Sequence, residues 1–140
     1  MIQWSFGAAQ NDLWTFEPIP SNTIIPIAGN YGGQCVAYAK ARLNPSSNIH
    51  GDAGTWYNSP YCTKTALKSQ VVACWTIGTQ GDGHVGVVEC YNSSTGKIVY
   101  SDSNYYFDQK IHVHTDINED QLKKLPGTSK YTFLGYVTLK

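Results

Sequence analysis

The residues best suited to chemistry in this sequence are one cysteine, one histidine and two polar residues close together. Cys35 follows Gly32-Gly33-Gln34, His84 follows a glycine-rich turn, and Asp102 and Asn104 stand two residues apart. A cysteine thiolate can attack a carbonyl carbon, and a histidine within reach can take the thiol proton and later deliver it. A carboxylate or an amide on the other ring nitrogen would then fix the orientation of that histidine.

The segment after Cys35 predicts a helix that begins at the cysteine. Residues 36–43 are rich in good helix formers, and Asn44-Pro45 ends the helix because proline cannot continue the hydrogen-bond ladder. Cys35 then lies in the first turn, where free backbone N–H groups and the positive end of the helix dipole favour a thiolate. The alternative interpretation is a small buried core cysteine, the ordinary state of a free cysteine.

The C-terminal half of the chain predicts an antiparallel sheet that positions the other candidates. Apolar stretches between turn sequences indicate strands at residues 70–77, 84–91, 97–105, 109–114 and 131–139. His84 opens one strand, and Asp102 and Asn104 share a face of the next because side chains alternate along a strand. Each alternative is structural, namely a hydrogen-bonded core histidine and a merely polar strand end.

The remaining segments complete an α+β domain. Asp52 is expected to cap a short helix that reaches about Tyr57, and Asn118 to cap a helix over 119–124. Residues 58–69 read as a loop, and the proline-rich residues 1–29 as an irregular N-terminal arm.

Composition excludes several classes of protein. The chain has 140 residues, ten basic against ten acidic, so no basic field favours nucleic acid or anionic lipid. No apolar run is long enough for a membrane span, and the N-terminus lacks the features of a signal peptide. The cysteines form no CxxC pair, which argues against structural zinc, and we expect all of them to be reduced, with Cys74 and Cys90 packed in strands.

Three motifs in order resemble one family, the CHAP domain, a cysteine- and histidine-dependent amidohydrolase/peptidase of the papain-like superfamily. They are Gly-Gln-Cys at a helix start, Gly-His-Val-Gly-Val-Val-Glu at a strand start, and Asp-Ser-Asn-Tyr on the next strand. The resemblance extends over roughly residues 30–139. It implies a papain-like fold with N-terminal helices packed on an antiparallel β-sheet, in which residues 30–140 form the catalytic domain.

The resemblance also implies roles for individual residues. Cys35 is the nucleophile and His84 the base, while Gln34 and Cys35 form the oxyanion site. The third position, most often Glu in the family, falls on Asp102, with Asn104 in the place of the family's asparagine. Aspartate is one methylene shorter than glutamate, so either Asp102 or Asn104 could orient His84.

Aromatic residues near these motifs could form the floor of a substrate groove. They are Trp56, Tyr57, Trp75 and Tyr105, and the alternative interpretation of each is a core aromatic. Some phage members of the family bind calcium at positions occupied here by Pro26, Ala28 and Ala37, which carry no carboxylate. We therefore expect no metal and no other cofactor.

The activity that the resemblance implies is hydrolysis of an amide bond in bacterial peptidoglycan. The enzyme would be an N-acetylmuramoyl-L-alanine amidase or a peptide endopeptidase, in a phage endolysin or a bacterial autolysin. We expect a monomer, alone or joined to a wall-binding domain, that is made in the cytoplasm and acts at the cell wall after release. An excised domain of a secreted protein would reach the wall by export. The alternatives are a non-catalytic wall-binding module and a toxic effector or transferase with the same thioester chemistry.

Overall fold

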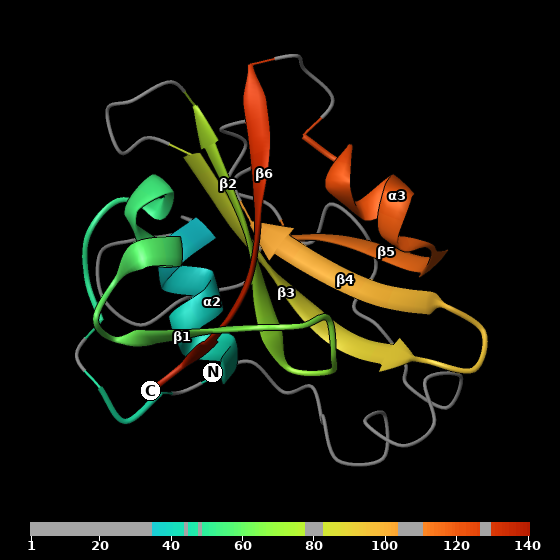
Figure 1. Cartoon of the computed structure of the whole chain (residues 1–140), viewed down its shortest axis with the longest axis horizontal. Coiled ribbons are helices and arrows are strands. Elements are labelled where there is room, and N and C mark those ends of the chain that lie inside the picture. The colour runs from blue at the N-terminus through green and yellow to red at the C-terminus, as the bar shows by residue number, and fades with distance from the viewer. Residues whose placement is uncertain (1–34, 44, 48, 78–82, 104–110, 127–129) are drawn as a thin grey trace.

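The fold is an antiparallel sheet of six strands with a few short helices around it (Figure 1). The computed structural model describes residues 35–43, 45–47, 49–77, 83–103, 111–126 and 130–140. Within these residues no helix is long and apolar enough to cross a membrane. The predicted N-terminal arm, residues 1–29, lies outside the described residues.

The order of the strands across the sheet is β1-β6-β2-β3-β4-β5, and every neighbouring pair is antiparallel. The strands are β1 (Cys62–Thr65), β2 (Val71–Ile77), β3 (Gly83–Asn92), β4 (Lys97–Ser103), β5 (Ile111–Ile117) and β6 (Tyr131–Leu139). All five strands predicted from the sequence are present, with bounds shifted by a few residues. The missed strand is β1, in a segment that was predicted to be a loop.

Central strands are apolar on both faces because both faces of the sheet are covered. One cluster includes Val72, Cys74 and Val85 and packs on residues from the two helical segments that precede the sheet. The other includes Val71, Ala73 and Leu122, the last from the helix that follows β5. Adjacent residues of β2 fall into different clusters, as the alternation of side chains along a strand requires.

In the part of the chain that the structure describes, three short helical segments flank the sheet, with α2 (Cys35–Leu43) and η2 (Ala53–Asn58) on one side and α3 (Glu119–Lys123) on the other (Figure 1). Helix α2 begins at the cysteine and ends at Leu43, as predicted. In α3, Asn118 Oδ1 accepts from the backbone of Gln121 at 2.8 Å, which confirms the predicted cap.

The helical part of the predicted fold needs correction. The predicted layer of N-terminal helices is not supported, because residues 1–34 lie outside the described residues and the helical segments before the sheet within them are two short ones, α2 and η2. The segment η2 is a 3₁₀-helix, and the side chain of Asp52 makes no capping hydrogen bond to it. Instead, Thr55 contacts Asp52 through its hydroxyl, which donates to the Asp52 carbonyl oxygen at 2.6 Å.

Candidate active site

His84 is the second residue of β3, where it pairs with Trp75 on β2. Its side chain is almost completely buried, with 3% of the residue exposed. The indole ring of Trp75 lies beside the imidazole, with 5.7 Å between ring centroids. The strand and the tryptophan together hold the imidazole in one position at the end of the sheet.

Asp102 on β4 is the carboxylate that contacts this imidazole. Its Oδ2 lies 2.8 Å from Nε2 of His84, and both side chains are buried. The register pairs Val87 with Ser101, so Asp102 lies level with Gly86, two residues from His84. Residues two apart on a strand share a face, which brings the carboxylate and the imidazole together diagonally.

A tyrosine that the sequence analysis did not single out also contacts this carboxylate. Tyr100 donates its hydroxyl hydrogen bond to Asp102 Oδ2 at 2.7 Å. The other oxygen, Oδ1, is buried and has no hydrogen-bond partner among the described residues. The signal for Tyr100 was its spacing, because a residue two positions before Asp102 in a strand faces the same side.

Cys35 approaches His84 from the first residue of α2. Its side chain is half-buried and packs against the cluster that contains Tyr38 and Val72. Burial alone would lower the pKa of His84, but the charge and hydrogen bond of Asp102, together with those of Cys35, raise it from 6.5 to about 10. Since Asp102 contacts Nε2, the nitrogen left for Cys35 is Nδ1.

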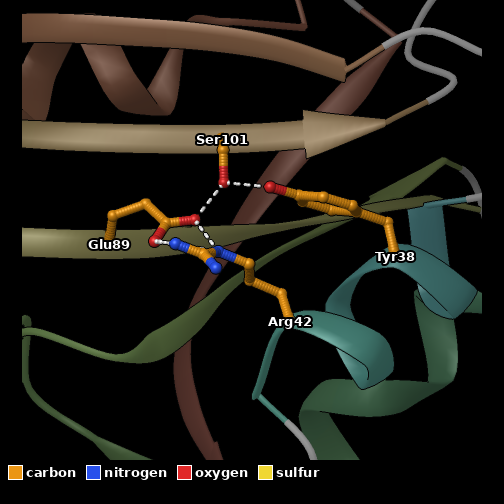
Figure 2. Close-up of polar contacts among 4 residues, drawn as sticks. All are labelled: Tyr38, Arg42, Glu89 and Ser101. Carbon is orange, nitrogen blue, oxygen red and sulfur yellow. Dashed lines mark hydrogen bonds and ion pairs between the residues drawn. The ribbon is translucent and has the colours of Figure 1, made fainter. Parts of the chain in front are cut away.

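A buried polar network fastens α2 to the sheet (Figure 2). Arg42 forms an ion pair with Glu89 on β3, with Nε and one terminal nitrogen each 2.9 Å from a carboxylate oxygen. Tyr38 donates to Ser101 Oγ at 2.7 Å, and Ser101 in turn donates to Glu89. Glu89 follows Val87 by two residues on β3, and Val87 packs in the cluster on the helix side, so the side chain of Glu89 faces the helix as well.

This network controls the placement of the cysteine. Tyr38 and Arg42 follow Cys35 by three and seven residues, so the three side chains lie along one face of the helix. Ser101 and Asp102 are neighbours in β4, one bound to the helix network and the other to His84. The helix that carries Cys35 is therefore tied to Ser101, and His84 is tied to its neighbour Asp102, on one strand.

Two of the four aromatic residues proposed for a substrate groove belong to the core instead. Trp56 and Trp75 have no exposed surface, because Trp56 belongs to the core cluster that contains Tyr38 and Val72, and Trp75 packs between Tyr100 and Phe133. Their burial fits the alternative interpretation of each as a core aromatic, and Trp75 flanks the imidazole. Tyr57 is half-buried and keeps an exposed edge.

Three predicted site residues are not among the described residues. Gln34, Asn104 and Tyr105 lie outside them, so their predicted roles stay predictions. Among the residues that the structure does describe, no group of three histidine, cysteine, aspartate or glutamate side chains is arranged to hold a metal ion.

The other thiols differ from Cys35 in their surroundings. All four cysteines are free, and Cys74 and Cys90 are buried as predicted. Burial raises the pKa of Cys62 to about 11 and raises the pKa of Cys74 and Cys90 as well. A thiol with a raised pKa carries little thiolate at neutral pH.

Comparison with known proteins gives one match. The family model described as CHAP domain matches residues 26–104, which is 79 of the 140 residues. This range includes Cys35, His84 and Asp102. The comparisons with curated proteins and with solved structures gave no significant match.

Proposed function

Because this chain belongs to the family of CHAP domains, we propose that it hydrolyses an amide bond of bacterial peptidoglycan with Cys35 as the nucleophile. The observation that carries the proposal is the position of His84, with Asp102 on Nε2 and Cys35 as its other polar neighbour. A histidine between a carboxylate and a thiol can hold the thiol proton as an imidazolium.

In the first half of the reaction, the sulfur of Cys35 attacks the carbonyl carbon of the scissile amide. The resulting oxyanion is stabilised by the backbone N–H of Cys35 at the start of α2, where no helical carbonyl accepts it, and by Gln34. His84 gives its proton to the amide nitrogen as the C–N bond breaks. The amine leaves, and a thioester to Cys35 remains.

In the second half, water replaces the amine. His84 takes a proton from the water as its oxygen attacks the thioester carbonyl, and the tetrahedral intermediate expels the Cys35 thiolate. The carboxylic acid product departs, and the thiolate and imidazolium are restored. Asp102 stays ionised throughout, holding the ring in place and stabilising its charge.

The test is digestion of purified cell walls followed by mass spectrometry of the soluble fragments. Wild type should release amide-cleaved fragments, while Cys35→Ser and His84→Ala should release none above background. Cys62→Ser is the matched control, because it removes a half-buried free thiol elsewhere on the sheet. Wall binding without fragments from wild type would contradict the proposal and support a binding module.

The same fragments identify the bond that is cut. Cleavage of the muramoyl–alanine amide frees a lactyl carboxyl and an alanine amino group, whereas cleavage within the peptides leaves the lactyl amide intact. A fragment carrying a new amide to an added amine would instead support a transferase. We propose that the enzyme acts at the wall after release from the cell that makes it, as an endolysin or autolysin does.

A further inference from the structure

Tyr100 lies in the core and contacts the Asp102 carboxylate of the candidate site. It is fully buried in β4, and its hydroxyl donates to Asp102 Oδ2 at 2.7 Å. The same oxygen lies 2.8 Å from Nε2 of His84. One carboxylate oxygen therefore accepts from two donors, and one of them is the proposed base.

The space that Tyr100 occupies exists because residue 86 is glycine. A Cβ at Gly86 would lie 1.9 Å from the Tyr100 hydroxyl oxygen and 2.3 Å from the ring carbon that bears it. The ring is also held from the side by Trp75, edge to face, at 6.1 Å between centroids. The tyrosine therefore has little freedom to leave Asp102.

We propose that Tyr100 is a positioning residue of the site, whose hydroxyl fixes the Asp102 carboxylate against His84 and shares its negative charge. This proposal rests on the proposed function, and it adds a residue that touches neither substrate nor nucleophile. Gly86 belongs to the same arrangement because it leaves room for the phenol ring beside the carboxylate.

The hydroxyl changes how strongly His84 holds its proton. A hydrogen bond to a carboxylate stabilises the anion and disperses its charge. Without that bond, Asp102 would attract the imidazolium more strongly and the pKa of His84 would rise further. A more basic His84 is a poorer acid toward the leaving amine, so the chemical step slows.

The first test is Tyr100→Phe, compared with Tyr136→Phe. Tyr136 is a matched control because its hydroxyl also donates to a carboxylate, Glu119 Oε2, at 2.7 Å, away from His84. In wall digestion, Tyr100→Phe should lower kcat about tenfold with KM unchanged, as loss of a hydrogen bond to a charged group allows. The upper limb of its pH–rate profile should move up by about one pH unit.

The second measurement needs no substrate and separates this proposal from the proposed function. Nitrogen NMR of the imidazoles during a pH titration should give a higher pKa for His84 in Tyr100→Phe than in wild type, and no change in Tyr136→Phe. That shift in a protein unable to cleave cell walls would overturn the proposed function and leave the role of Tyr100 standing. An unchanged or lower His84 pKa would overturn the role of Tyr100.

Gly86→Ala is a second way to separate the Tyr100 hydroxyl from the Asp102 carboxylate. Its methyl group would push the phenol away while leaving the hydroxyl in the protein. If it folds, its His84 titration should shift in the same direction as that of Tyr100→Phe. Full activity together with an unchanged titration would overturn the proposal.

Discussion

Asp102 shows how a shorter side chain can still reach the histidine that we propose as the base. The family most often has glutamate at this position, yet Oδ2 of Asp102 already lies 2.8 Å from the imidazole. The carboxylate approaches the imidazole diagonally from the neighbouring strand, and an aspartate side chain is long enough to make this contact. The carboxylate is also nearly unexposed, at 1%, so little water competes for it.

The first prediction is that Asp102→Asn lowers kcat by as much as about 10⁴-fold, the cost of losing an orienting carboxylate in a triad. The pH–rate profile should lose its alkaline part, because the charge that raises the pKa of His84 is gone. Steady-state kinetics on cell walls over a pH series measures both effects. The exposed Asp116→Asn is the matched control and should leave kcat unchanged.

The contrary outcome concerns Asn104. If Asp102→Asn were nearly silent and Asn104→Ala abolished turnover, an amide would be the orienting group. The site would then use the cysteine–histidine–asparagine arrangement of papain-like proteases.

The second prediction separates the thiols. Iodoacetamide at neutral pH should alkylate Cys35 first, because the imidazolium of His84 lies beside it. Cys62 should react much more slowly, since burial raises its pKa to about 11, and Cys74 should be protected by the sheet. Peptide mapping over time measures the order, and labelling of Cys62 ahead of Cys35 would argue against an activated nucleophile.

Residue types and spacing could single out Cys35, His84 and the pair Asp102 and Asn104 as candidates, but not the residues behind them. Tyr100 and Trp75 lie in apolar, strand-forming stretches where an aromatic residue is the usual occupant of a core. Trp75 contacts the imidazole through cross-strand register, and register depends on pairing between distant segments. A sequence read alone does not contain that pairing, so it could not separate a core aromatic from a groove aromatic.

At the scale of elements, the site depends on how α2 is held against β3 and β4. A helix of nine residues gains little stability from its own backbone, so its orientation comes from packing and from the Arg42–Glu89 pair. Both partners are almost fully buried, with side-chain exposures of 2% and 0%. Breaking such a pair leaves an uncompensated charge inside the protein.

The third prediction follows from this burial. Glu89→Gln should destabilise the folded protein by about 3–5 kcal/mol, because Arg42 would remain buried without its counter-charge. Urea unfolding measures the change. Lys97→Gln is the control, because Lys97 and Asp116 form an exposed pair 3.9 Å apart, and its loss should cost less than about 1 kcal/mol. Equal effects from the two substitutions would show that the buried network does not hold the helix.

Strands with long apolar runs could be predicted from the sequence, whereas the short polar strand β1 could not. The apolar runs of β2 and β3 identify them as strands because both faces of these strands are buried. Strand β1 has the sequence Cys-Thr-Lys-Thr, which is short and polar, and it forms because β6 offers it a partner. Its existence depends on a segment more than sixty residues away, which local patterns do not report.

At the scale of the whole molecule, the raised pKa of His84 links stability to pH. The folded protein binds the proton more tightly than the unfolded chain, with a pKa of about 10 against 6.5. The stabilisation from His84 is therefore complete below pH 6.5 and is lost as the pH rises through about 10.

The fourth prediction concerns how the stability contributed by His84 changes with pH. Wild type should be more stable than His84→Asn by a margin that is largest near pH 6 and shrinks toward pH 10, by on the order of 4 kcal/mol. Urea unfolding of both proteins across this range measures the margin. Val72→Ala is the control, because it removes no titratable group, and its margin should stay constant across this range. A margin that grew with pH would mean that His84 is held neutral in the folded state.

The position of β6 in the sheet has a consequence for how the protein is made. This strand lies between β1 and β2, although it is the last strand to leave the ribosome. From the end of β2 at residue 77 to the start of β6 at residue 131 the ribosome must add 54 residues, which takes about 3–11 s at ordinary rates of synthesis. During that time the apolar edge of β2 has no strand beside it on that side, and unpaired edges favour aggregation. Nascent chains of this protein are therefore most exposed to chaperones just before β6 emerges.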